Sequence, residues 1–279
     1  EQVSHPPPIS AYSATAENFS VRGQSEFTNR FWGKYMEMTP KGTTHVTLAT
    51  SGKQYYYSGV TTILNNILMG TAYIEHHGEL VIKCVGSKAY ASVLLKKKGL
   101  LSGNGKEVKG KIVDENGKTV YELIGEWDKY LNAKDKNSGE IIEIFKKNPT
   151  FNDFYYLSAF GIHLNEPVTA EESLLRSDSR LRPDQRLHEK GDMIEAAEVK
   201  NKLEDRQRKA KKLREREGTE YEPRWFTLID DEITQEEVYA PKEDFWQALA
   251  SGVQLEGIPE VFNFEEAQNE AEEESKQSQ

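Results

Sequence analysis

The feature that most constrains this fold is a succession of short segments with β-strand patterns before Pro149, joined by glycine-containing turns. No helical pattern separates them, and many alternate apolar and polar residues with a period of two. Strands that follow one another in this way predict an antiparallel meander, with one apolar and one wet face. If it closes into a barrel, its interior can hold a ligand. The segments are FSVRGQSEF, THVTLAT, KQYYYSGV, TAYIEHHGELVIKCV, KAYASVLLK and VKGKIV.

Two hairpins are predicted within this β region. In KIVDENGKTVYELIGEW, alternating segments flank Asn116-Gly117, a pair that can adopt the positive φ angles of a type I′ turn. KDKNSGEI repeats the pattern around Ser138-Gly139.

After Pro149 the patterns are those of helices. The longest predicted helix runs from Met193 to Glu217, where Asp192 can cap the first turn and Gly218 can end the last. Its apolar side is predicted as one stripe at helical spacing: Ala196, Val199, Leu203, Ala210 and Leu213.

Other segments after Pro149 carry weaker signals. TAEESLLRS has Thr169 and Glu172 at the spacing of a capping box, and EDFWQALASG is typical of a short helix. LRSDSRLRPDQRLHEKGD, which contains Pro183, is interpreted as a charged linker. The acidic, polar sequence from Phe264 onward predicts disorder.

The patterns together predict an α+β protein in three parts. Residues 1–148 form the antiparallel β-barrel portion, 149–263 a helical subdomain packed on it, and 264–279 a disordered acidic tail.

Composition restricts the classes of partner. A net charge of −10, from 36 Lys and Arg against 46 Asp and Glu, argues against a nucleic-acid partner. The single cysteine, Cys84, cannot form an internal disulfide and is interpreted as a core residue of a protein in a reducing compartment such as the cytoplasm. Because no apolar run approaches the roughly 20 residues that span a bilayer, any membrane contact is predicted to be peripheral.

Known catalytic and metal-binding motifs do not occur. The sequence has no G-x-S-x-G, P-loop, H-E-x-x-H or C-x-x-C motif, so we predict no enzyme activity and no cofactor. His76 and His77 are adjacent, but neighbours on a strand point to opposite faces, so no metal site is predicted. The lysines at 96–98 are interpreted as a solvated turn, with contact to anionic lipid as the alternative.

Two segments resemble one family in the same order along the chain. EQVSHPPPISAY resembles the EQVSHHPP fingerprint of the oxysterol-binding protein-related family. SDSRLRPDQRLHEKGDMIEAAEVKNKLEDRQRKAKK, followed by PRWF, resembles the family's C-terminal helical segment, and GEWDK fits its Gly-x-Trp. The resemblance covers residues 1 to about 248. It implies that the family's lid helix and first strands lie upstream of Glu1, which would leave an incomplete barrel here.

The resemblance implies a lipid-binding and lipid-transfer protein. Its members hold a sterol or a phospholipid such as phosphatidylserine in a barrel-like tunnel, and many exchange it for phosphatidylinositol 4-phosphate between membranes. That implies a cytoplasmic protein, peripheral at organelle membranes or membrane contact sites. On the family's motifs, the phosphoinositide head group would be bound by His5, Lys200, Glu204 and Arg208.

The helix spacing supports this assignment independently. Residues at i, i+4 and i+8 lie along one side of a helix, so Lys200, Glu204 and Arg208 should flank the apolar stripe. Arg suits a phosphate because its planar fork binds two oxygens. The alternative for these three residues is an ordinary solvated ladder of ion pairs, worth about 0.3–0.5 kcal/mol per pair.

Pro6 departs from the family pattern, because the fingerprint has a second histidine there. Proline offers no side-chain donor, and losing one donor to a charged phosphate costs about 1.5–3 kcal/mol, or roughly 10- to 100-fold in affinity. Phosphoinositide binding is therefore expected to be weakened or lost. The alternative function is a non-transferring scaffold or regulatory relic with a disabled phosphoinositide site.

Overall fold

The structure, a computed structural model, describes residues 1–4, 7–98, 105–148, 158–164 and 182–251. The chain divides into two compact units. The helical unit comprises residues 1–5, 150–227 and 241–279, and the sheet unit comprises residues 6–149 and 228–240. The boundaries predicted from the sequence remain a prediction. His5, Pro6, the capping box at Thr169 and the acidic tail lie outside the described residues.

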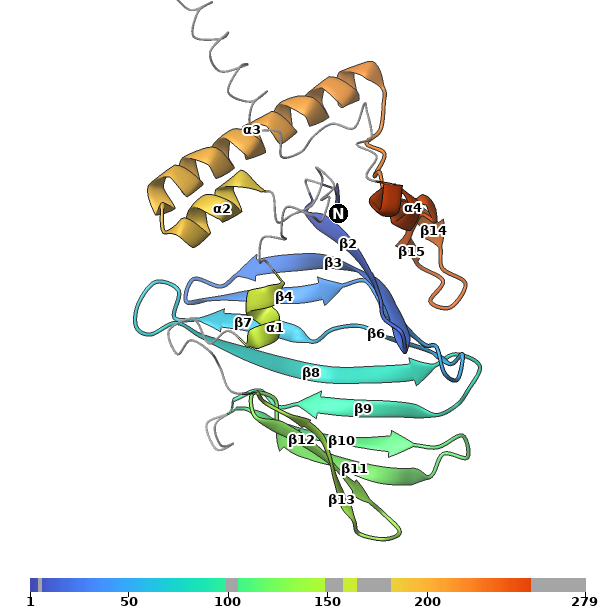
Figure 1. The fold of residues 1–279 in the computed structure, drawn as a ribbon. Coiled ribbons are helices and arrows are strands. Elements are labelled where there is room, and N and C mark those ends of the chain that lie inside the picture. The colour runs from blue at the N-terminus through green and yellow to red at the C-terminus, as the bar shows by residue number, and fades with distance from the viewer. Residues whose placement is uncertain (5–6, 99–104, 149–157, 165–181, 252–279) are drawn as a thin grey trace, which may run out of the picture. The chain divides into compact units, whose positions relative to one another are not determined.

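The sheet unit is an antiparallel meander, with strands side by side in Figure 1. Neighbours follow the order β2-β3-β4-β7-β8-β9-β10-β11-β12-β13, while β5 pairs with β3 and β6, and β6 pairs with β8. This confirms the α+β fold with a large antiparallel sheet, which is not a closed barrel. The strands are β2 (Ile9–Thr15), β3 (Phe19–Phe31), β4 (Tyr35–Lys41), β5 (Thr44–Leu48), β6 (Gln54–Tyr57), β7 (Thr61–Asn65), β8 (Tyr73–Cys84), β9 (Tyr90–Leu95), β10 (Glu107–Val113), β11 (Thr119–Glu126), β12 (Tyr130–Asp135) and β13 (Ile141–Lys146).

The strand register separates an apolar face from a charged face. Residues directly opposite each other on paired strands share a face, so each row can be followed across the sheet. The apolar face contains the rows Phe31-Met36-Leu64-Ile74 and Leu95-Val108-Gly125-Leu131-Phe145. The opposite face contains the rows Leu94-Lys109-Ile124-Asn132-Glu143 and Ser92-Lys111-Glu122-Lys134.

Much of the apolar face remains accessible. Phe31 is 61% exposed and Ile74 50%, whereas Val108 and Leu123 are buried. A sheet that presents large apolar side chains at such exposure has the surface that an apolar ligand requires.

The predicted hairpin at Asn116-Gly117 is confirmed, but its type I′ turn is wrong. Only Gly117 adopts a positive φ, of 80°. The Asp114 carboxylate accepts hydrogen bonds from the backbone N–H of Asn116 and of Lys118, each at 2.9 Å. This Asx-type turn needs one left-handed residue, as in a three-residue loop with a glycine bulge.

The second predicted hairpin, around Ser138-Gly139, is also confirmed and uses the same chemistry. Gly139 has a φ of 74°. The Asp135 carboxylate accepts from the backbone N–H of Asn137 and of Ser138. In both loops an aspartate at the end of a strand holds the turn, and glycine supplies the positive φ.

The long helix, α3 (Met193–Glu217), has its predicted bounds. Gly218 ends it in the left-handed conformation at φ 68°, whereas the Asp192 side chain makes no capping hydrogen bond. The predicted stripe is correct only in its first half: Ala196, Val199 and Leu203 are buried, but Leu213 is 52% exposed.

The segment interpreted as a charged linker is instead partly helical. The α2 helix (Pro183–Lys190) begins on Pro183 and packs against α3. Proline suits this first position because its missing N–H would have no intrahelical partner there. Gly191, at φ 90°, ends the helix. The other described helices are α1 (Ala159–His163) and α4 (Asp244–Ser251). The α4 helix confirms the short helix predicted in EDFWQALASG.

The prediction of helices alone after Pro149 missed the strands β14 (Phe226–Asp230) and β15 (Glu237–Pro241), which pair with each other. The part of this hairpin from Leu228 to Ala240 belongs to the sheet unit. It is attached there by hydrogen bonds to two side chains of β3. Arg22 donates to the Asp231 carboxylate at 3.0 Å, and the Tyr239 N–H donates to Gln24 at 3.1 Å.

Candidate functional site

The structure brings three of the predicted site residues into one row on α3. The ammonium of Lys200 and the guanidinium of Arg208 each lie 3.7 Å from the Glu204 carboxylate. The side chains of Lys200, Glu204 and Arg208 are 59%, 30% and 51% exposed. They are accessible to a ligand, and the two cations are oriented by one central carboxylate.

Arg208 has a second carboxylate partner that spacing alone did not single out. Its Nη2 donates to Asp205 at 2.5 Å, and this hydrogen bond, together with the charges of Asp205 and Glu204, raises the pKa of Arg208 above its ordinary value. An anionic ligand at Arg208 would therefore compete with two carboxylates for the guanidinium.

The first residues of the chain lie against α3. Strand β1 (Gln2–Ser4) belongs to the helical unit, and the Gln207 amide donates to the Gln2 side chain at 3.3 Å. Val3 and Leu203 are each only 2% exposed. The beginning of the fingerprint therefore contacts the helix at the residue before Arg208.

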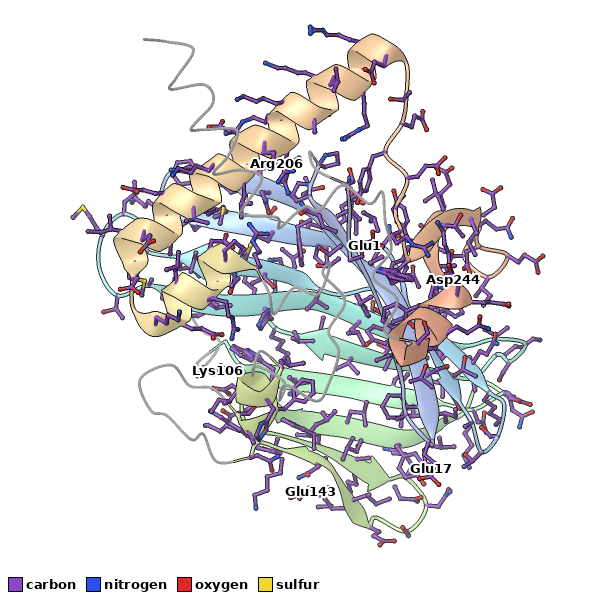
Figure 2. All side chains as sticks on the ribbon, turned by 45° about the horizontal axis from the view of Figure 1, so that its top comes forward. Glu1, Glu17, Lys106, Glu143, Arg206 and Asp244 are labelled. Atoms are coloured by element: carbon purple, nitrogen blue, oxygen red, sulfur yellow. The ribbon has the colours of Figure 1, made fainter. Side chains whose placement is uncertain are left out.

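The fingerprint also binds the PRWF segment. The Glu1 carboxylate accepts from the backbone N–H of Arg224 and of Trp225, both at 2.8 Å. Arg224 forms an ion pair with Asp244 at 3.1 Å, and Trp225 packs edge-on against Phe245 at 5.1 Å between ring centroids. Figure 2 labels Glu1 and Asp244, which mark the two ends of this network.

Sequence reasoning missed these contacts. Glu1 and Gln2 belong to the quoted fingerprint, and Arg224 and Trp225 belong to PRWF. The only signal in the sequence was that both motifs resemble the same family, which does not say which residues are in contact. Their contacts show that the two motifs that carry the resemblance form one structural unit.

The histidines of β8 lie on opposite faces of the sheet. His76 Nδ1 is 3.0 Å from the Thr62 hydroxyl, and its ring packs edge-on against Trp127 at 4.7 Å. Burial lowers the pKa of His76, which keeps the imidazole neutral near pH 7. Within the described ranges, no three His, Cys, Asp or Glu side chains gather as metal ligands.

Two other sequence interpretations need revision or detail. Cys84 is only partly buried, so its assignment to the core is wrong. Among the lysines at 96–98, Lys96 donates to Glu107 at 2.8 Å and Lys98 lies over the Tyr73 ring.

No described helix is both long enough and apolar enough to cross a membrane.

Comparisons with known proteins agree with the two motifs. The family model described as Oxysterol-binding protein matches residues 1–250. Human oxysterol-binding protein-related protein 3 is 38% identical over 237 residues, which are 83% of this chain and 26% of the human protein. Oxysterol-binding protein-related protein 1B of Arabidopsis thaliana is 34% identical over 269 residues, 94% of this chain and 53% of that protein. The chain thus spans about a quarter of the human relative and about half of the plant one.

Solved structures share the fold. The Osh1 ORD domain in complex with ergosterol superposes with a TM-score of 0.84 at 26% identity, over 92% of this chain and 66% of that one. The Osh3 ORD in complex with PI(4)P from Saccharomyces cerevisiae gives 0.74 at 28% identity, over 90% of this chain and 66% of that one. Because the family model matches residues 1–250 and a relative is 38% identical over 83% of the chain, the chain belongs to the oxysterol-binding protein family.

Proposed function

We propose that this chain binds one lipid, a sterol or a phospholipid, and carries it between membranes without catalysing a reaction. The observation that supports this most is the apolar face of the sheet, whose aligned rows contain large side chains such as Phe31 and Ile74. The Osh1 ORD domain, which has the same fold, is known in complex with ergosterol and with cholesterol.

Exchange of this lipid for phosphatidylinositol 4-phosphate is the second part of the proposal. The row of Lys200, Glu204 and Arg208, together with His5, would bind the phosphorylated head group. The complex of the Osh3 ORD with PI(4)P supports the assignment by similarity. Exchange also places the protein in the cytoplasm, peripheral to organelle membranes or membrane contact sites.

Transfer between vesicles tests the first part. Donor vesicles that contain a fluorescent sterol or labelled phosphatidylserine are mixed with acceptor vesicles, and the chain is expected to accelerate exchange of one label in proportion to its concentration. Ile74→Asp places a charge on the apolar face and should abolish this acceleration, because burying an unpaired carboxylate against a lipid chain is costly.

A matched variant controls for effects on stability. Ile124→Asp introduces the same charge at a similarly exposed position, 47% against 50% for Ile74, but on the opposite face. It should transfer as the wild type does. The proposal is wrong if the wild type moves neither lipid, or if both variants transfer at the wild-type rate.

The alternative is a scaffold that has kept the fold and lost the head-group site. Pro6 favours it, as does the engagement of Arg208 by Asp205 and Glu204. We expect Pro6→His to tighten binding to vesicles containing phosphatidylinositol 4-phosphate at least roughly 10-fold, since it restores one donor to a charged phosphate. Vesicle co-sedimentation measures this, and a wild type that already binds as tightly as the variant would contradict the alternative.

A further inference from the structure

A basic cleft lies on the charged face of the sheet, at the β12–β13 hairpin. Its volume is about 380 Å³, and Glu143, labelled in Figure 2, marks its place. Three lysines and one glutamate are among the six residues that line it. These residues are Lys129, Tyr130, Asn132, Glu143, Lys146 and Lys147. The cleft belongs entirely to the sheet unit, whereas the row on α3 belongs to the helical unit.

A bulge in β13 creates the cleft. Asn132 pairs with Glu143 but Leu131 pairs with Phe145, so Ile144 is an extra residue on β13. Strict alternation would put Lys146 on the face opposite to Glu143. The bulge instead brings it opposite Tyr130, on the same face as Glu143.

The lysines are placed where their own charges disfavour them. The Lys147 N–H donates to the Lys129 carbonyl at 2.8 Å, so these two residues lie across from each other on neighbouring strands, where like charges are destabilising. The Glu126 carboxylate, 2.7 Å away, neutralises Lys129. Within the described part of the chain, the ammonium groups of Lys146 and Lys147 have no carboxylate partner.

Exposed apolar side chains lie on the same strand as Lys146. All six residues of β13 are exposed; Ile144, two positions before Lys146, is 50% exposed, and Ile141, at the start of the strand, is 66% exposed. Lysines next to exposed aliphatic side chains match a bilayer surface, where the ammonium groups meet anionic head groups and the aliphatic groups enter the interface. An acidic peptide would offer the charge but would not account for the isoleucines.

We propose that the β12–β13 hairpin is a membrane-docking surface for anionic phospholipids, with Lys146 and Lys147 as its main cationic contacts. This deepens the proposed function, on which it rests for the need of a membrane partner. The surface would hold the protein on a bilayer through a part of the molecule other than the head-group site on α3.

Vesicle flotation tests the proposal with phosphatidylcholine vesicles that contain or lack phosphatidylserine. Lys146→Ala/Lys147→Ala is expected to weaken partitioning onto the anionic vesicles roughly 30-fold, and Ile141→Ser several-fold. Lys53→Ala/Lys88→Ala removes the same charge from exposed positions elsewhere in the sheet unit and should leave partitioning close to wild type. An equal loss in this control, or no loss in the cleft variant, would overturn the proposal.

Two further measurements separate the outcomes. If the chain binds inorganic phosphate but does not float with the anionic vesicles, the cleft binds small anions and the docking proposal is wrong. Uptake of a fluorescent sterol from cyclodextrin needs no membrane and tests the proposed function alone. A chain that floats with anionic vesicles but takes up no sterol would disprove sterol carriage while the docking surface stands.

Discussion

Arg208→Ala is expected to weaken binding to phosphatidylinositol 4-phosphate by at least roughly 100-fold if the α3 row contacts the head group. The variant removes a planar fork able to make two charge-assisted hydrogen bonds to one phosphate, each worth about 1.5–3 kcal/mol. Arg208 is half exposed, so its loss should leave the fold intact. Co-sedimentation with vesicles that contain the phosphoinositide measures the change.

Arg216→Ala is the matched control on the same helix. Arg216 lies in the last turn of α3, two turns beyond Arg208, and is exposed. It should reduce binding only through the general loss of one charge. Equal affinities for the two variants would show that the row is an ordinary solvated ladder, the alternative that its spacing left open.

Asp231→Ala is expected to lower the free energy of unfolding by about 3–5 kcal/mol, because it leaves a partly buried guanidinium without its partner. The Asp231 side chain is 4% exposed and accepts from Arg22 at 3.0 Å, from the Thr234 hydroxyl at 2.8 Å and from the Thr234 N–H at 3.0 Å. Urea unfolding measures the loss. Asp230→Ala, at the exposed neighbouring position, is the control and should cost little.

The same cluster should make stability fall in acid. Burial, followed by the charge of Arg22, lowers the pKa of His45, whose Nε2 lies 3.6 Å from Asp231. Burial by itself would raise the pKa of Asp231, but hydrogen bonds from Thr234 and Arg22 outweigh it and lower that pKa. Both groups bind protons more readily when unfolded. The free energy of unfolding should therefore decline below about pH 6.5 through His45, and again below about pH 4 through Asp231. In Asp231→Ala the second decline should be smaller, and an unchanged decline there would contradict this assignment.

Local sequence patterns predicted most of the sheet and the long helix. Alternation identifies a strand even when the strand it pairs with is not known, and Gly218 ends α3 because glycine adopts the left-handed conformation easily. The β14–β15 hairpin was missed because its segment is acidic and its attachment depends on Asp231 and Arg22, which are 209 positions apart. The α2 helix was missed because its charged segment was interpreted as a linker, although proline is favoured in a first turn.

In the candidate sites, too, local patterns predicted some features, whereas features that depend on distant residues were missed. Spacing along one helix predicted the ladder of Lys200, Glu204 and Arg208. Spacing along the chain could not predict the hydrogen bond between Gln2 and Gln207, because no local sequence pattern includes both residues. The basic cleft depends on a bulge at Ile144, and alternation by itself would have placed Lys146 on the other side of the sheet.

The hydrogen bonds of Glu1 also set the order of events during synthesis. Their partners, Arg224 and Trp225, are 223 and 224 positions further along the chain. At about 5–20 residues per second, a ribosome needs roughly 10 to 45 s to reach them, and contacts at such separation form late in folding as well. Strands β2 to β13 can pair during this interval, so Glu1 reaches its final contacts only after the segment around Arg224 has been synthesised.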